Sequence, residues 1–312
     1  MIRLFIAALA LSLGAASPAS AGEKLTVLLD WFTNPDHAPL YVAQELGYFA
    51  DAGLEVELIA PADPNDPPKL VAAGQADIAV SYQPQLHVQI AEGLPIMRIG
   101  TLVATPLNSL VVMADGPIHS IADLKGRKVG YSIGGFEDAL LRVMLARHGL
   151  SLADITLINV NFSLSPALIT GNVDAVIGAF RNFELNQMDI VGRPGRAFFV
   201  EEEGVPVYDE LIFIAHRDRL DDWRLRAFLD AIEAATLYLI NHPDDAWKLF
   251  VAGRAELDDE LNRRAWRDTL PRFALRPAAY DAVRYERFAR FLKDQGLIPE
   301  ALPAEAYGVE LR

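Results

Sequence analysis

Residues 24–37 have the sequence KLTVLLDWFTNPDH, and this stretch decides the fold. Lys24–Asp30 is rich in β-formers and predicts a strand, and Thr33–Asp36 contains the Asn and Pro typical of a turn. The apolar residues of Pro39–Phe49 then predict a helix that Gly47 helps to close. A strand that leads through a short turn into a helix is the repeating unit of an α/β domain.

The chain continues with the same alternation. Leu54–Ile59 (LEVELI) alternates apolar and acidic residues and predicts a second strand. A helix is expected over about 68–73, ending at Gly74, and Asp77–Ser81 is expected to be the third strand. This strand–helix–strand–helix–strand order predicts a mainly parallel sheet.

The alternation recurs in a second segment of the chain. Gly74-x-x-Asp77 and Gly171-x-x-Asp174 lie at equivalent places, where an apolar helix end meets a glycine and an aspartate opens the next strand. An ordinary helix-to-strand connection looks the same, so this signature alone indicates two similar α/β lobes. The expected elements are strands at 128–132, 155–159 and 175–180, and helices at 137–148 and about 166–170.

Two extended apolar stretches, Leu107–Ala114 and Glu210–Ala215, flank the second segment and predict crossovers between lobes. A helical tail follows, in which Asp221 can cap a helix that Pro243 ends, and we expect it to pack on the first lobe. The predicted fold class is α/β, with two lobes joined by two crossover strands and a ligand cleft between them. The expected division is 22–107 and 210–312 for lobe I, and 108–209 for lobe II.

The composition excludes several classes of function. The 312 residues include 28 Lys and Arg against 42 Asp and Glu, a net charge of −14, and no cysteine. Phosphate repulsion argues against a nucleic-acid partner, and no cysteine chemistry is available. The six histidines lack the close spacing of a metal site, and no Gly-x-Ser-x-Gly elbow is present. We therefore expect no metal, no cofactor and no catalytic residue.

The first 21 residues predict a secretory signal peptide. Arg3 precedes an apolar stretch, Leu4–Ala16, and Ala19-Ser20-Ala21 has the small-x-small pattern of a cleavage site. The apolar stretch is shorter than the roughly 20 residues that a membrane span needs. We expect cleavage after Ala21 and a periplasmic location.

Aromatic and polar residues follow two predicted strands of the first lobe. Trp31 begins the turn after the first strand, where at least one ring of the Trp-Phe pair should lie at the cleft end of the sheet. Asn34 and His37 belong to the same turn and are further candidates for ligand contact. Tyr82 follows the third strand and is a candidate second wall. Core aromatics and an ordinary edge tyrosine are the alternatives.

The second lobe offers two comparable places. Ser132, Gly134 and Gly135 lie ahead of a helix, where hydroxyl and backbone N–H groups can hold a polar ligand end, although a plain tight turn fits too. Phe183 and Glu184 follow the strand at 175–180. Glu184 can accept from the exocyclic amine of a heteroaromatic ligand, with a second contact if a ring nitrogen is protonated. A salt bridge to a neighbouring arginine, or a helix N-terminal acid, is the alternative.

The turn from Asp30-Trp31, the helix end Gly47-Tyr48-Phe49 and the Gly74-x-x-Asp77 strand resemble a known family over nearly all of the chain after residue 21. It is the family of periplasmic solute-binding proteins of ABC importers that is shared with thiamine-pyrimidine synthases. The resemblance implies a type II periplasmic binding protein fold and a permease and ATPase as partners of a monomer. Within the family, the sequence is most similar to members that bind hydroxymethylpyrimidine or its N-formylamino relative. There the pyrimidine contacts map onto Trp31, Tyr82 and Glu184, and Tyr208 completes our set of candidate ligand-binding residues.

The same family includes an enzyme that builds the pyrimidine phosphate. The resemblance places its cofactor lysine at Ser81, its active histidine at Gln85 and its cysteine-rich iron loop at Pro206–Glu210. None of the three is present. His87 lies two residues beyond the expected histidine position, so a local gap in the alignment could restore the histidine but not the lysine or the loop. We therefore expect binding without chemistry, because serine cannot form the Schiff base that a lysine would.

Other members of the family bind nitrate, taurine, alkanesulfonates or riboflavin. Anionic ligands call for basic residues, whereas the turns here carry acids, amides and aromatic rings. This favours a neutral or cationic heteroaromatic ligand. Riboflavin stays open as an alternative, because the same aromatic walls could hold a larger ring.

Overall fold

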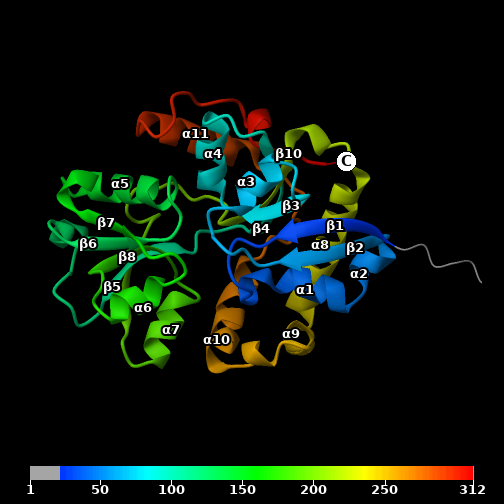
Figure 1. Ribbon diagram of the computed structural model, residues 1–312, viewed down its shortest axis with the longest axis horizontal. Coiled ribbons are helices and arrows are strands. Elements are labelled where there is room, and N and C mark those ends of the chain that lie inside the picture. Colours follow the sequence, from blue (N-terminus) through cyan, green and yellow to red (C-terminus); the bar gives the residue numbers. More distant parts are fainter. Residues whose placement is uncertain (1–21, 312) are drawn as a thin grey trace, which may run out of the picture.

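The computed structural model describes residues 22–311, so the predicted signal peptide lies outside the described residues. The chain forms two five-stranded sheets, in the orders β2-β1-β3-β10-β4 and β7-β6-β8-β5-β9. Figure 1 shows them side by side, each between helices, and we call the first sheet with its helices lobe I and the second lobe II. The predicted two-lobe α/β fold is confirmed. Within residues 22–311, no helix combines the length and apolar character that crossing a membrane requires.

The sheet of lobe I is mainly parallel. Strand β1 pairs in parallel with β2 and β3, and β10 lies antiparallel between β3 and β4. Figure 1 shows α4 and α11 on one face and α1 and α8 on the other. The strands are β1 (Glu23–Leu28), β2 (Leu54–Ile59), β3 (Ile78–Ser81), β4 (Ile96–Val103) and β10 (Leu211–His216); the helices are α1 (Ala38–Glu45), α2 (Tyr48–Asp51), α3 (Pro67–Ala72), α4 (Gln83–Ala91), α8 (Trp223–Asn241), α9 (Pro243–Val251), α10 (Glu260–Thr269) and α11 (Ala282–Asp294).

The sheet of lobe II repeats this plan. Strand β6 pairs in parallel with β7 and β8, and β5 lies antiparallel between β8 and β9. Helix α5 covers one face, and α6 and α7 cover the other (Figure 1). The elements are β5 (Asn108–Met113), β6 (Lys128–Tyr131), α5 (Glu137–Arg147), β7 (Thr156–Asn159), α6 (Leu164–Ile169), β8 (Ala175–Phe180), α7 (Glu184–Ile190) and β9 (Gly195–Phe199).

Three details differ from the sequence expectations. The two apolar stretches expected as crossovers are β5 and β10, interior strands of one sheet each, because their buried side chains complete the two cores. The chain crosses between the lobes just before β5 and just before β10. The single helix expected over 39–49 is divided into α1 and α2, since Gly47 has a φ of +76°. Asp222 caps α8 in place of Asp221, accepting from the backbone N–H of Arg224.

Candidate ligand-binding site

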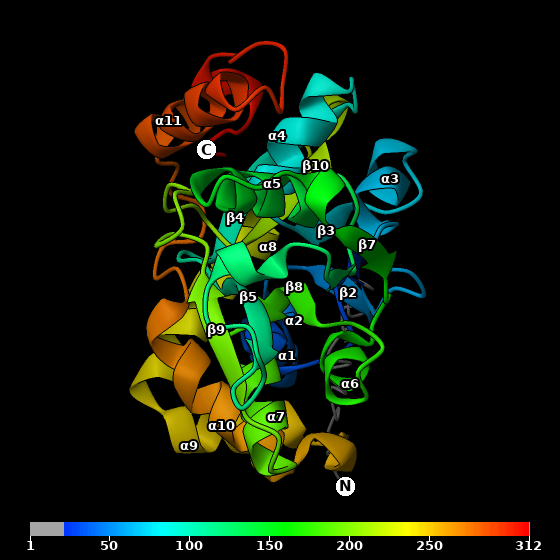
Figure 2. The same cartoon turned by 90° about the vertical axis from the view of Figure 1, so that its left-hand side faces the viewer.

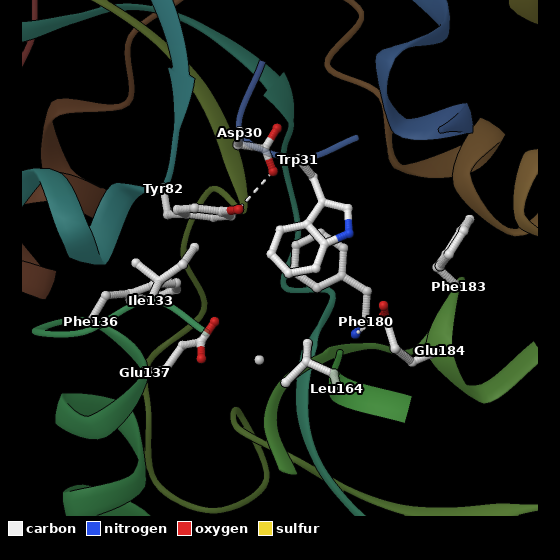
Figure 3. A pocket seen from close by; sticks show the side chains of 11 residues that line it. Asp30, Trp31, Tyr82, Ile133, Phe136, Glu137, Leu164, Phe180, Phe183 and Glu184 are labelled. Atoms are coloured by element: carbon white, nitrogen blue, oxygen red, sulfur yellow. Dashed lines mark hydrogen bonds between the residues drawn. The ribbon is translucent and has the colours of Figure 1, made fainter. Parts of the chain in front are cut away.

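A cavity lies between the two lobes, at the ends of the parallel strands. The space between its lining side chains, counted together with its opening to solvent, measures about 390 Å³, and Figure 3 shows the side chains that point into it. In an α/β sheet, ligands bind outside the carboxyl ends of the strands, and here two such ends face each other. The lining residues are Asp30, Trp31 and Tyr82 from lobe I, and Ile133, Phe136, Glu137, Leu164, Gly178, Phe180, Phe183 and Glu184 from lobe II.

Two of the predicted residues form the wall on lobe I. Trp31 follows β1 and Tyr82 follows β3, and because these strands are parallel neighbours their ends bring the two side chains together. The Tyr82 hydroxyl donates to Asp30 Oδ2 at 2.6 Å (Figure 3). Burial, together with the charge of Asp30, raises the pKa of Tyr82 well above its usual range. Tyr82 therefore stays a neutral, fixed ring.

Asn34 and His37 lie behind this wall and do not line the cavity. The backbone N–H of Asn34 donates to Nδ1 of His37 at 3.3 Å, which leaves Nε2 as the proton-bearing nitrogen. Nε2 lies 2.9 Å from Asp30 Oδ1 and donates to it. The Asn34 side chain accepts from the backbone N–H of Asp36 at 2.8 Å and caps the turn. Both residues thus position Asp30.

Glu184 provides the polar part of the wall on lobe II. It is the first residue of α7, next to the end of β8, and only 7% of it is exposed. The backbone N–H of Phe180 donates to its Oε2 at 2.7 Å. Burial raises the pKa of Glu184 to about 8, and the negative charge of Asp36 adds to this rise. The carboxyl group is therefore mostly protonated at neutral pH and can both donate and accept.

Aromatic rings from both lobes surround the polar groups. Tyr82 of lobe I stacks on Phe136 of lobe II, with ring centroids 4.9 Å apart and an interplanar angle of 20°. Trp31 meets Phe162 edge to face at 4.6 Å, and the predicted Phe183 lines the cavity and lies 5.7 Å from Phe32. Such rings suit a flat aromatic ligand.

Glu137 is a lining residue that the sequence analysis missed as a site residue. It is the first residue of α5, is 3% exposed, and accepts from the backbone N–H of Ser132 at 2.7 Å through Oε2. In the sequence, Glu137 marks only the start of a predicted helix. Its place in the cavity depends on Gly178, a glycine within the neighbouring strand β8, which is the one signal that could have drawn attention to it.

The structure does not bring Ser132, Gly134 or Gly135 into the cavity lining. The Ser132 hydroxyl donates to the backbone oxygen of Asn161. The N–H of Gly134 donates to Asn65 Oδ1 at 3.1 Å, and the Asn65 amide donates to the Ser132 carbonyl at 3.2 Å. Gly135 has a φ of +77° and forms the tight turn. This segment therefore joins lobe II to the Asn65 loop of lobe I.

Tyr208 also lies outside the cavity lining. It is fully buried where the chain returns to lobe I, and its hydroxyl donates to Glu210 Oε2 at 3.2 Å. The same oxygen accepts from the backbone N–H groups of Leu107 and Asn108 at 2.6 and 2.9 Å. Tyr208 thus supports the two connections between the lobes.

The contact of Asn65 with Gly134 joins the lobes at one rim of the cavity. A second contact joins them at another rim, where α7 lies beside α10 (Figures 1 and 2). Asn182 of lobe II donates to Asp36 Oδ1 at 2.6 Å, and its amide nitrogen is 2.7 Å from the hydroxyl of Thr269. Thr269 donates to Asp36 at 2.8 Å. Burial raises the pKa of Asp36 to about 6. The two rims hold the lobes together over the cavity.

The cavity lining contains three carboxyl groups and no lysine, arginine or histidine. Within residues 22–311, no group of three or more potential ligand side chains is arranged to hold a metal ion. A site with acids, aromatic rings and no cation favours a ligand that is flat and rich in hydrogen-bond donors. It offers nothing that would neutralise a sulfonate or a nitrate.

The two lobes and the cavity between them have the architecture of a periplasmic binding protein. The model of the family described as NMT1/THI5 like matches residues 34–246, and the chain belongs to this family. A solved structure with the same fold is the alkanesulfonate-binding protein SsuA from Xanthomonas axonopodis pv. citri bound to MOPS, with a TM-score of 0.72 over 95% of this chain and 100% of that chain. At 17% identity, this likeness shows the periplasmic binding protein fold.

Three relatives describe where the chain stands in its family. A Haemophilus influenzae protein assigned to thiamine biosynthesis is 55% identical over 295 residues, 94% of each chain. The formylaminopyrimidine-binding protein of Halalkalibacterium halodurans is 32% identical over 82% of this chain and 78% of its own. The 4-amino-5-hydroxymethyl-2-methylpyrimidine phosphate synthase of Schizosaccharomyces pombe is 27% identical over 89% of this chain and 83% of its own.

Proposed function

We propose that this protein is the solute-binding component of an ABC importer and that it binds a thiamine pyrimidine precursor, hydroxymethylpyrimidine or its N-formylamino relative. The observation that carries this proposal is the pairing of Glu184 with the aromatic walls of Trp31 and Tyr82 in one cavity between the lobes. The relative that is named as a formylaminopyrimidine-binding protein supports the same class of ligand.

Glu184 matches one edge of an aminopyrimidine. Its Oε2 accepts from Phe180, so Oε1 carries the proton and donates to a ring nitrogen, while Oε2 has a second lone pair for the exocyclic amine. If the ring is protonated and Glu184 is ionised, the same two contacts form with the proton on the other side. Either way the complex contains one shared proton, and the acid orients the ring.

Delivery to a transporter fits the arrangement of the lobes. A permease must distinguish loaded from empty binding protein, and closure of two lobes over a ligand makes that distinction. The contacts of Asn65 with Gly134 and of Asp36 with Asn182 are suited to form on closure, because each joins the two lobes. With cleavage after Ala21, the protein would act as a monomer in the periplasm.

The synthase activity of more distant relatives is the alternative from another class. Ser81 and Gln85, at the positions of the synthase lysine and histidine, are buried and hydrogen-bonded to each other at 3.0 Å. His87 is buried between the carbonyl oxygens of Gln83 and Tyr285, and it is not a cavity residue. The cavity lining contains no lysine that could take its place, which supports binding without chemistry.

Calorimetry on the chain from residue 22 tests the ligand. We expect hydroxymethylpyrimidine or its formylamino analogue to bind and to quench tryptophan fluorescence, while an alkanesulfonate and nitrate give no heat. Riboflavin binding without pyrimidine binding would overturn the ligand assignment and leave the fold untouched. Mass spectrometry of the ligand released from protein purified from its native host would identify the physiological compound.

A separate incubation tests the enzyme alternative. With pyridoxal phosphate and iron, the chain should show neither an imine absorbance nor the loss of a histidine fragment by mass. A time-dependent mass loss would favour the synthase.

A further inference from the structure

Lobe II presents two buried glutamates in equivalent positions. Glu137 and Glu184 are the first residues of α5 and α7, which follow the neighbouring parallel strands β6 and β8. Each accepts through Oε2 from a backbone N–H at the end of its strand, from Ser132 and Phe180 respectively, and both distances are 2.7 Å. Figure 3 shows the two carboxyl groups on either side of Trp31 and Phe180.

The position of Glu137 requires a glycine on the next strand. A Cβ on Gly178 would lie 2.3 Å from Oε1 and 2.4 Å from Cδ of Glu137, and the φ of Gly178 is +97°. A glycine inside a strand weakens the sheet and commonly marks a place where another group approaches closely. Gly178 thus makes β8 less stable at the point where it leaves room for the Glu137 carboxyl.

The carboxyl group of Glu137 lines the cavity and can reach a ligand. Its hydrogen bond with the backbone N–H of Ser132 uses Oε2, and the backbone N–H of Ile133 also stabilises the carboxylate form. No side-chain donor contacts this carboxyl within residues 22–311. The Tyr82 hydroxyl, the other polar group nearby, already donates to Asp30. Burial raises the pKa of Glu137 to about 8, and the charges of Asp138 and Glu210 add to the rise. A buried carboxyl without a cationic partner is stabilised by any donor that reaches it.

We propose that Glu137 is a second ligand-binding acid and a specificity-determining residue, which hydrogen-bonds to the polar group on the pyrimidine's ring substituent while Glu184 holds the aminopyrimidine edge. The inference rests on the proposed function and extends it to the choice among pyrimidines. It assigns the preferred ligand class: aminopyrimidines with a hydroxyl, amine or amide N–H on the substituent, in preference to those with a methyl group there. A site built to pair with a donor discriminates against a ligand that lacks it, because its polar group is left unpaired.

Three ligands that differ only in this substituent test the proposal by calorimetry. They are 4-amino-2-methylpyrimidines with a methyl, hydroxymethyl or aminomethyl group at ring position 5. For the unaltered protein we expect the hydroxymethyl and aminomethyl compounds to bind about 10- to 100-fold more tightly than the methyl compound, the cost of leaving one buried polar group unpaired. This comparison needs no variant and so cannot fail through misfolding.

Glu137→Gln then distinguishes a ligand contact from a structural role. Its amide oxygen must keep the N–H of Ser132, so its NH₂ group faces the ligand. An ammonium group cannot accept from this NH₂, whereas a hydroxyl can. We expect the aminomethyl compound to fall to the affinity of the methyl compound, and the hydroxymethyl compound to lose less.

Glu184→Gln is the matched control, because it has the same helix position and the same type of backbone contact. It should weaken all three ligands by a similar factor. If Glu137→Gln also weakens all three equally, or if the unaltered protein does not prefer the donor-bearing ligands, Glu137 does not contact the substituent and this inference is wrong. If none of the pyrimidines binds, the proposed function fails with it.

Discussion

The carboxyl groups on the two walls of the cavity differ in their hydrogen-bond partners. Asp30, on lobe I, is already satisfied, since it accepts from Tyr82 at 2.6 Å and pairs with His37 at 2.9 Å. Within residues 22–311, Glu137 and Glu184 of lobe II accept from backbone N–H groups and have no side-chain partner. In the proposed function, lobe I would therefore supply a rigid aromatic wall, and lobe II would supply the polar contacts that choose the ligand.

Gly178→Ala should have the largest effect on stability, because the added methyl group takes up the space that the Glu137 carboxyl occupies. The positive φ alone costs about 1–2 kcal/mol for a residue with a Cβ, and the overlap with Glu137 adds about 1–3 kcal/mol. We expect the free energy of unfolding, measured with urea, to fall by about 2–5 kcal/mol.

Gly135→Ala is the control for this change. Gly135 has a φ of +77°, and a Cβ there meets nothing within 4 Å, so this variant measures the backbone strain alone. Adding Glu137→Ala to Gly178→Ala should recover part of the loss. Equal costs for the two glycine variants would mean that Glu137 is not confined by Gly178.

Glu184→Gln should have the next largest effect, on affinity. The substitution keeps the shape, but an amide cannot pass a proton to the ring nitrogen, so the charge-assisted form of the pair is lost, at a cost of about 1.5–3 kcal/mol, or roughly 10- to 150-fold in Kd. Asp30→Asn is the contrasting variant: an amide can rotate to satisfy either Tyr82 or His37, so we expect a lower melting temperature with Kd within about threefold. Similar losses of affinity for both variants would contradict the division of roles between the lobes.

The contrast between the lobes could be predicted only in part from the sequence. Strand ends were recognisable, and with them Trp31, Tyr82, Phe183 and Glu184, because the carboxyl ends of parallel strands meet at one edge of a sheet. A β-rich stretch followed by an aromatic or acidic residue is a local pattern. This local pattern predicts the position of the side chain in the folded protein, because the strand itself determines where the next side chain points.

Glu137 and Tyr208 show what local patterns miss. A glutamate at the start of a helix is ordinary, and only the glycine on the adjacent strand distinguishes Glu137 from other helix N-terminal acids. Tyr208 was a candidate ligand-binding residue, but it lies outside the cavity, against Glu210 at the connections between the lobes. Both placements depend on which strands become neighbours, and strand order is a tertiary property that no single segment of sequence contains.

The pH dependence of stability offers a further test of the carboxyl groups of lobe II. Glu137 and Glu184 have a folded pKa of about 8 against an ordinary value of 4.5, so the folded state binds more protons than the unfolded state between these values. Stability should therefore fall as the pH rises from about 4.5 to 8. His87, whose pKa burial lowers to about 4, gives the opposite slope below its ordinary value of 6.5, so the measurement is best made from pH 6.5 to 8.

Glu137→Gln and Glu184→Gln should each flatten this slope in urea unfolding measurements on ligand-free protein, by at most about 1.4 kcal/mol per pH unit. Glu210, whose pKa burial raises to about 7, keeps part of the slope in both variants. An unchanged slope in both glutamine variants would mean that the two acids are ionised in the folded protein, and the polar wall would then hold charges.

Trp31→Phe should have the smallest effect on affinity and a large effect on the signal. A phenyl ring still stacks on a pyrimidine, so the loss is about 0.5–1 kcal/mol, or about two- to fivefold in Kd. The fluorescence quenching that accompanies binding should disappear, because Trp31 is the tryptophan that lines the cavity. Trp223→Phe is the control, since Trp223 is 54% exposed at the start of α8 and is not a cavity residue. If quenching persists in Trp31→Phe and is lost in Trp223→Phe, the ligand does not lie against the wall of lobe I, and the rigid aromatic half of the comparison has to be abandoned.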